Sequence, residues 1–215
     1  MQMLKDAILE RGKALNQDIL LVDSFLNHQV DVALMKAVGE TFAAHFANRG
    51  ITRVVTIESS GIAPASFTAL ALGLPLVIMK KQTSRILNGD LLQTTVRSFT
   101  KGTEYQLSVK HEFLNADDNI LLIDDFLASG EAAFGVITLA KQVGAKISGV
   151  GIVIEKAFQS GHKRLEDAGI DVYSLARIAS MSLWWRSTGI MCRCISSFPT
   201  TGAFASSIFP RKFTS

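Results

Sequence analysis

The stretch that most constrains this chain is residues 119–135, NILLIDDFLASGEAAFG. Residues 120–123 are apolar without interruption, which predicts a strand buried on both faces, as in the centre of a parallel sheet. Asp124 and Asp125 would then lie at the carboxyl end of that strand, the edge where ligands of open α/β sheets bind. The sequence therefore predicts an α/β fold with a ligand site beside two carboxylates.

The residues after this strand have the composition of a phosphate-binding turn. They are Ala128, Ser129, Gly130, Glu131 and Ala132. Gly130 permits close approach of the backbone to a ligand, and Ser129 can cap the helix that the following small apolar residues predict. Free backbone N–H groups at a helix N-terminus attract phosphate. Two aspartates alone could also belong to an ordinary turn, where Asp is common. Adjacent negative charges are unfavourable, however, unless the carboxylates bind a cation or accept hydrogen bonds from hydroxyl groups.

Length and charge narrow the class of protein. The chain has 215 residues, 48% hydrophobic and 19% charged, which is ordinary for one globular domain. Residues 1–177 hold 18 of the 22 basic and all 19 acidic residues, a net charge of −1, so charge gives nucleic-acid binding no support. No apolar run is long enough to cross a bilayer, and the start lacks the apolar core of a signal peptide. We therefore expect a cytoplasmic protein with no nucleic-acid or membrane partner.

A second unit of strand, turn and helix precedes the first. Residues 52–57 are rich in β-branched side chains and predict a strand, and residues 62–72 predict a tightly packed helix. The turn between them consists of Glu58, Ser59, Ser60 and Gly61. This turn is a second candidate anion site, although an ordinary connection between strand and helix would look alike.

Further strands complete the predicted sheet. Apolar runs at residues 75–79 and 146–154 predict two more central strands, and two alternating segments within residues 94–109 predict a hairpin. Lysines follow both apolar runs: Lys80, Lys81 and Lys156. Each would stand at the ligand edge of the sheet, where a solvated strand-end lysine is the ordinary alternative.

Together these features resemble the phosphoribosyl diphosphate (PRPP) signature of the type I phosphoribosyltransferases. The resemblance covers about residues 1–180, and residues 20–31 (LLVDSFLNHQVD) and 153–161 (VIEKAFQSG) are similar to the xanthine-specific members. It implies a mostly parallel, twisted sheet flanked by helices in residues 1–178, with a small hood near residues 12–31 and a flexible flap at the hairpin. It also implies a homodimer.

The same resemblance implies transfer of the 5-phosphoribosyl group from PRPP to xanthine, releasing diphosphate, in purine salvage. Asp124 and Asp125 would be the catalytic groups beside the ribose hydroxyls, and residues 128–132 would cradle the 5′-phosphate. Because Glu131 is acidic, its side chain should point away from that phosphate.

The remaining site residues are implied for the diphosphate and the base. The turn at residues 58–61 and one lysine, Lys81 or Lys80, would meet the diphosphate, with Mg²⁺ bound mainly through PRPP and no dedicated protein metal site. Three residues would contact xanthine: Leu20, Asn27 and Lys156. From the residues alone, the apolar segment around Leu20 also fits a buried cover or a subunit contact.

The pattern changes at residues 179–215. This tail has no convincing helical or strand period, contains no acidic residue, and holds both cysteines, whose single C-x-C is poor evidence for zinc. It departs from the resemblance, and a changed coding frame, an unusual extension or a disordered segment would explain it.

Three other functions stay open: a hypoxanthine or guanine enzyme of the same fold, a PRPP-sensing regulator that binds nucleic acid, and an inactive chain.

Overall fold

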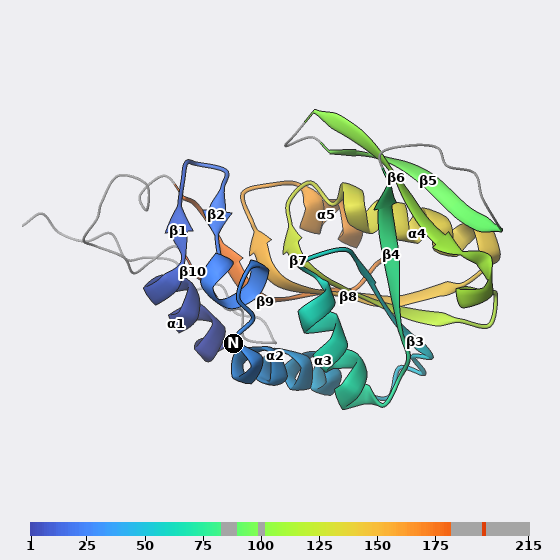
Figure 1. Cartoon of the computed structure of the whole chain (residues 1–215), viewed down its shortest axis with the longest axis horizontal. Helices are drawn as coiled ribbons and strands as arrows, with labels where there is room; N and C mark the ends of the chain where they lie inside the picture. The colour runs from blue at the N-terminus through green and yellow to red at the C-terminus, as the bar shows by residue number, and fades with distance from the viewer. Residues whose placement is uncertain (83–89, 99–101, 182–194, 197–215) are drawn as a thin grey trace, which may run out of the picture.

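The computed structural model describes residues 1–82, 90–98, 102–181 and 195–196 and is built on an eight-stranded sheet (Figure 1). The strand order is β10-β9-β8-β7-β3-β4-β6-β5. The strands from β9 to β4 are parallel, and the outer pairings are antiparallel. The strands are β3 (Arg53–Ile57), β4 (Leu76–Gln82), β5 (Leu91–Ser98), β6 (Thr103–Lys110), β7 (Asn119–Leu127), β8 (Lys146–Lys156), β9 (Val172–Ile178) and β10 (Ile195–Ser196). The prediction of a mostly parallel α/β fold is confirmed.

Helices cover both faces of this sheet (Figure 1). Helices α2 (Val32–His45) and α3 (Ile62–Leu72) lie on one face, and α4 (Glu131–Val143) and α5 (Gly161–Asp167) lie on the other. Along β7, Leu121 and Ile123 are buried in the core on the α2 side, while Ile120 and Leu122 are buried in the core on the α4 side. The uninterrupted apolar run of β7 is therefore a strand buried on both faces, as predicted.

Strands β4, β7 and β8 run further than the sequence predicted, and β8 continues to Lys156, which pairs with Ile178 of β9. β7 continues through Asp124 and Asp125 to Leu127, because β8 pairs with it as far as Glu155. The two aspartates therefore lie inside the last part of the strand and not beyond its end. β4 likewise continues through both lysines, because the antiparallel strand β6 pairs with them.

The predicted hairpin is present and is longer than its sequence pattern. β5 and β6 pair from Leu91 with Lys110 to Ser98 with Thr103, and residues 99–101 of the turn lie outside the described residues. A 3₁₀ helix, His111–Phe113, follows β6. The hairpin extends the sheet beyond β4, above the end of the strands that carries the two aspartates (Figure 1).

The N-terminal segment packs beside β9 (Figure 1), and its buried residues belong to the same hydrophobic core as those of α2 and β9. It consists of α1 (Gln2–Arg11), the two-stranded hairpin of β1 (Lys13–Ala14) and β2 (Leu20–Leu21), and the π-helix Asp23–Asn27. Val22, Phe25 and Leu26 of this segment are buried, whereas Met3, Leu15 and Ile19 are exposed. We call residues 12–31 the hood. The Asp31 side chain then caps α2 by accepting from the Leu34 N–H at 3.1 Å, as its position predicted.

The tail contains one strand that the sequence did not predict. β10 pairs antiparallel with β9, with Ile195 opposite Ile178. The other tail residues, 182–194 and 197–215, lie outside the described residues, and with them most of the segment expected to be atypical. Within the described ranges, no helix combines the length and hydropathy needed to cross a membrane.

The contact between α2 and α3 gives a prediction about stability. A Cβ atom on Gly39 would lie 2.4 Å from the carbonyl carbon of Phe67, too close for any side chain. Gly39→Ala must push the helices apart, and we expect it to lower the free energy of unfolding by about 1–3 kcal/mol in urea titrations. Glu40→Ala on the same helix removes only an exposed pair with Lys36 and should cost less than about 0.5 kcal/mol. Equal effects of the two changes would contradict the close approach.

Candidate active site

Three neighbouring strands form one polar cavity of about 290 Å³. β3 contributes Ile57 and the turn that follows it, β4 contributes a lysine, and β7 contributes the carboxylate pair. The lining residues are Ile57, Glu58, Ser59, Ser60, Lys81, Asp124 and Asp125. The cavity thus brings together the aspartate pair, Lys81 and three predicted residues of the turn after β3, whereas Gly61 and residues 128–132 are not among its lining residues.

The two aspartates have different environments. Asp124 is buried, with 9% of its surface exposed, whereas Asp125 is half-buried. Burial raises the pKa of Asp124 well above its ordinary range, the charge of Asp125 acts in the same direction, and the charge of Lys81 opposes them. A second negative charge in this place is therefore costly until hydroxyl donors or a cation approach.

Hydrogen bonds orient the turn after β3 toward β4. Glu58 Oε1 accepts from the Lys81 backbone N–H at 2.7 Å, and its Oε2 accepts from Lys80 Nζ at 3.1 Å. A Cβ atom on Gly61 would lie 2.4 Å from Thr56 Oγ1 and 3.0 Å from an Asp124 carboxylate oxygen. Glycine at this position therefore allows the turn to lie directly against Asp124.

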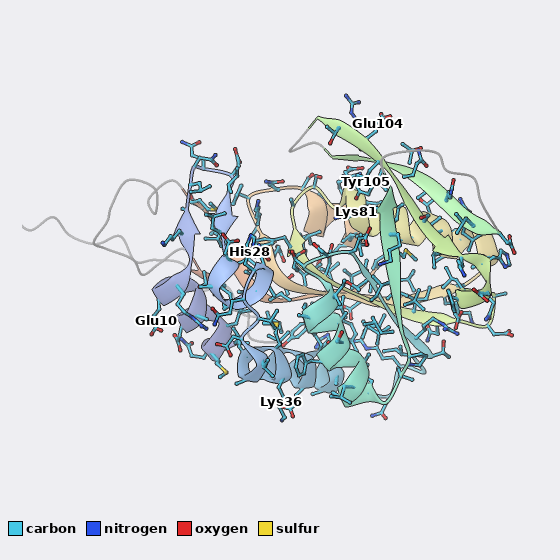
Figure 2. The ribbon with its side chains drawn as sticks, in the orientation of Figure 1. Glu10, His28, Lys36, Lys81, Glu104 and Tyr105 are labelled. Atoms are coloured by element: carbon cyan, nitrogen blue, oxygen red, sulfur yellow. The ribbon has the colours of Figure 1, made fainter. Side chains whose placement is uncertain are left out.

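The sequence left open whether Lys80 or Lys81 would meet the diphosphate. The two lysines have different surroundings in the structure. Lys81 lines the cavity, and its Nζ lies 5.5 Å from the ring centre of Tyr105 on β6 (Figure 2). The Lys80 ammonium instead pairs with Glu58. Burial and the charges of Asp124 and Glu131 raise the pKa of Tyr105 to about 12. Sequence reasoning missed Tyr105, because a tyrosine in an alternating strand carries no signal of its own.

The turn at residues 128–132 connects β7 to α4. The residue that caps α4 is Gly130, with a φ of 86°, and no side chain provides a cap hydrogen bond. The prediction that Ser129 caps the helix is therefore wrong, because the left-handed glycine makes the entry into the helix. That the Glu131 side chain points away from the 5′-phosphate remains a prediction. Its carboxylate accepts a hydrogen bond from Arg164 on α5.

The residues predicted to bind the base lie in two places. Lys156 is the last residue of β8, and Leu20 and Asn27 belong to the hood. Lys156 Nζ donates to the Asp18 carbonyl oxygen at 2.6 Å and lies 5.5 Å from the Phe126 ring centre. Burial lowers the pKa of Lys156, and the charges of Asp18 and Asp125 oppose the shift. Leu20 is buried, with 5% exposed, and the Asn27 side chain is exposed at the end of the π-helix. Lys156 thus meets the hood at Asp18, a contact that no sequence pattern indicated.

A buried ionic cluster stands beside Lys156. Glu155, 1% exposed, accepts from His162 Nδ1 at 2.9 Å, from Ser174 Oγ at 2.6 Å and from Arg177 Nε at 2.9 Å. Burial opposes ionisation, but these hydrogen bonds and the two cations hold the pKa of Glu155 below its ordinary value. The hydrogen bond to Glu155 raises the pKa of His162, against its burial.

This cluster makes stability depend on pH. His162 has a raised folded-state pKa, so its contribution is complete below its ordinary value of 6.5 and disappears as the pH rises through the folded-state value. Glu155 contributes above its ordinary value of 4.5 and loses that contribution only as the pH falls. We expect His162 to make the unfolding temperature fall as the pH rises above 6.5, against the opposite slope from His45, whose pKa is lowered by burial. His162→Gln keeps a donor but does not titrate, so it should remove the slope due to His162, and an unchanged slope would contradict the assignment.

Comparison with known proteins places the chain in a family. Residues 16–180 match the family model described as the phosphoribosyl transferase domain. The protein named xanthine phosphoribosyltransferase 1 of Clostridium botulinum is 59% identical over 181 residues, which cover 84% of this chain and 95% of that protein. The xanthine phosphoribosyltransferase of Clostridium acetobutylicum is 55% identical over 84% of this chain and 96% of that protein.

Solved structures agree at the level of the fold. An APRTase from Giardia lamblia complexed with 9-deazaadenine has a TM-score of 0.70 at 24% identity, covering 81% of this chain and 97% of that chain. The adenine phosphoribosyltransferase of Thermoanaerobacter pseudethanolicus has a TM-score of 0.67 at 18% identity, covering 81% and 99%. The matched domain extends from the hood through every described strand of the cavity, and this chain therefore belongs to the phosphoribosyltransferase family.

Proposed function

We propose that this chain transfers the 5-phosphoribosyl group of PRPP to xanthine, giving xanthosine 5′-monophosphate and diphosphate, in purine salvage. The observation that carries the proposal is the cavity in which the Asp124 and Asp125 pair meets the turn after β3. The 59% identity to a protein named xanthine phosphoribosyltransferase 1 supports the choice of base.

Each chemical part of PRPP has a partner of suitable charge along this edge. The turn at residues 58–61 and the Lys81 ammonium receive the diphosphate, and the two aspartates receive the ribose hydroxyls. The turn at residues 128–132, at the N-terminus of α4, receives the 5′-phosphate through backbone N–H groups. The substrate would therefore lie across the carboxyl ends of β3, β4 and β7.

The chemistry requires stabilisation of positive charge. Breaking the bond between the anomeric carbon and the diphosphate leaves positive charge on the ribose ring, and carboxylates fixed beside it stabilise that charge without reorganising. Asp125, half-buried at the cavity wall, is placed to do so. The β5–β6 hairpin stands above this edge, and its closure would exclude water from the electrophilic carbon.

Magnesium fits the donor set as an ion shared with the substrate. Mg²⁺ favours oxygen ligands and is usually bound by one or two carboxylates together with substrate phosphates and water. Glu58, Asp124 and Asp125 offer carboxylate oxygens in the one cavity. The described residues include no cluster of three or more His, Cys, Asp or Glu arranged to hold a metal. When bound with PRPP, the ion would supply neutralisation of the diphosphate charge.

Xanthine recognition is assigned to β8 and the hood. The Lys156 ammonium, already desolvated and turned toward the hood, would donate to the 6-oxo and N7 acceptors of the base. Asn27 would donate its amide N–H to the 2-oxo group, and Leu20 would pack against the ring. Asn27 is exposed in the structure, so rejection of bases that lack the 2-oxo group requires the bound base to cover its amide and leave that donor unpaired.

We infer a cytoplasmic homodimer whose partners are xanthine and PRPP, with no nucleic-acid or membrane partner. The net charge of −1 over residues 1–177 supports the exclusion of nucleic acid. The phosphoribosyltransferase domain would comprise residues 1–178, with residues 179–215 as an atypical tail.

The proposal is tested by incubating the purified chain with PRPP and magnesium chloride and each purine base in turn. Xanthine should yield xanthosine 5′-monophosphate and diphosphate in equal amounts, and omission of PRPP should abolish both. Release of diphosphate without any nucleotide would indicate hydrolysis of PRPP and would contradict the proposed transfer.

A further inference from the structure

Glu131 is the residue that fits a phosphate-binding turn least well. It is the first residue of α4, and 22% of its side chain is exposed. A carboxylate there interacts favourably with the helix N-terminus, but it also competes with a bound phosphate for that positive end and repels its charge. The charge of Glu131 reaches the ligand side of the sheet, where it joins burial and Asp124 in raising the pKa of Tyr105.

Arg164 on α5 neutralises this carboxylate and holds the turn at the same time. Its Nη1 donates both to Glu131 Oε1 and to the Ser129 carbonyl oxygen. The guanidinium also lies over the Phe134 ring, 4.8 Å from its centre. A planar guanidinium that stacks on a ring and donates to two acceptors has one well-defined position. The Glu131 side chain is thereby directed toward α5.

Close packing of α5 on the turn fixes the distance that Arg164 must span. The Gly161 N–H donates to the Ala128 carbonyl oxygen at 3.0 Å. A Cβ atom on Gly161 would lie 2.3 Å from that oxygen and 2.9 Å from the Gly130 nitrogen, so a larger residue would displace the helix. Arg164 therefore acts from a helix that is anchored directly to the turn.

We propose that Arg164 is a positioning residue for the phosphoribosyl substrate. It holds residues 128–132 in their phosphate-binding shape and withdraws the negative charge of Glu131 from the 5′-phosphate. This inference rests on the proposed function in assigning that phosphate to the turn, but the ion pair, the carbonyl contact and the packing of α5 carry it independently of the base that is used.

Arg164→Met tests the role, because methionine keeps an unbranched side chain beside Phe134 and removes the charge. We expect KM for PRPP to rise at least about tenfold, which corresponds to about 1.4 kcal/mol of binding free energy, with a smaller change in kcat. Adding Glu131→Gln to this variant should recover most of the increase, because the repelling carboxylate is gone. Lys163→Met is the matched control: it removes the same charge from α5, but Lys163 pairs with Asp167 in solvent, and KM should not change.

The rescue distinguishes positioning from a merely structural role. An unchanged KM in Arg164→Met, or a raised KM that Glu131→Gln fails to lower, would overturn the proposal. Arg164→Gln, which keeps a donor for the Ser129 carbonyl, is measured in parallel in case the methionine variant does not fold. It should also raise KM, because Glu131 stays charged, and an unchanged value would again count against the role of Arg164.

Calorimetric binding of ribose 5-phosphate separates this inference from the proposed reaction. The unmodified chain should bind it, Arg164→Met should bind it at least about tenfold more weakly, and the double variant should recover. If ribose 5-phosphate binds in this way but no base receives a phosphoribosyl group, the role of Arg164 is supported and the proposed function is contradicted. Failure of the unmodified chain to bind ribose 5-phosphate would overturn the phosphate turn and the role of Arg164 together.

Discussion

Asp125→Asn should lower kcat by about 10²–10³-fold, the typical effect of removing one fixed electrostatic group from a transition state. Asparagine has nearly the same shape but no charge to set against the positive ribose ring. The Asp125 charge also opposes the lowering of the Lys156 pKa by burial, so the substitution weakens the base site as well. The measurement is kcat with PRPP and xanthine both saturating.

The same substitution should not destabilise the fold. Asp125 contributes to the raised pKa of Asp124, which means that the two charges repel each other in the folded chain. Removing one charge relieves that repulsion, so the free energy of unfolding should stay equal or rise. Asp117→Asn, at an exposed position just before β7, is the control and should change neither quantity. A kcat for Asp125→Asn close to that of the unmodified chain would contradict its catalytic role.

Lys156→Met should lower kcat/KM for xanthine by about 10- to 150-fold, from the roughly 1.5–3 kcal/mol that a hydrogen bond to a charged group contributes. Methionine keeps the apolar stem beside Phe126 and removes the ammonium that donates to the hood. Because the diphosphate and 5′-phosphate turns are on other strands, KM for PRPP should change little. The measurement is a set of initial rates at varied concentrations of each substrate.

A lysine at the other end of the same strand provides the control for this change. Lys146 is exposed at the start of β8, so Lys146→Met removes the same charge far from the ligand edge. It should leave both KM values unchanged. If Lys156→Met raises KM for PRPP and leaves xanthine unaffected, the lysine serves the diphosphate and the assignment of the base is wrong.

Local patterns predicted the main elements because those patterns report burial directly. The unbroken apolar run at residues 120–123 predicts a central strand, and both its faces are buried in the structure. Gly73 and Gly144 end α3 and α4 in left-handed conformations, which glycine adopts without strain. The order of strand, turn and helix units likewise placed the two turns at one edge.

The sequence did not predict where strands end when neighbours prolong them. β4 continues past its apolar run because it pairs with β6, and β7 does so because it pairs with β8. The sequence pattern of a strand does not show this pairing. The missed cap of α4 has a similar origin. Ser129 has a suitable side chain for a cap, but the positive φ of Gly130 decides where the helix begins.

Contacts between distant segments were likewise out of reach of sequence patterns. Arg164 meets Glu131 only because α5 packs on the turn after β7, and Lys156 meets Asp18 only because the hood lies beside β8. Each of these residues has an ordinary surface role as its default interpretation. Tertiary packing, and not local spacing, brings each of these pairs together.

The most direct test of the central claim is a competition among bases for a limiting amount of PRPP. Xanthine, hypoxanthine, guanine and adenine are mixed at equal concentrations with magnesium chloride and the purified chain, and the nucleotide products are separated and quantified. Their ratio reports the ratio of kcat/KM values, and xanthosine 5′-monophosphate should dominate. A dominant product from another purine would keep the fold and the reaction but contradict the proposed base, and no nucleotide from any base would contradict phosphoribosyl transfer itself.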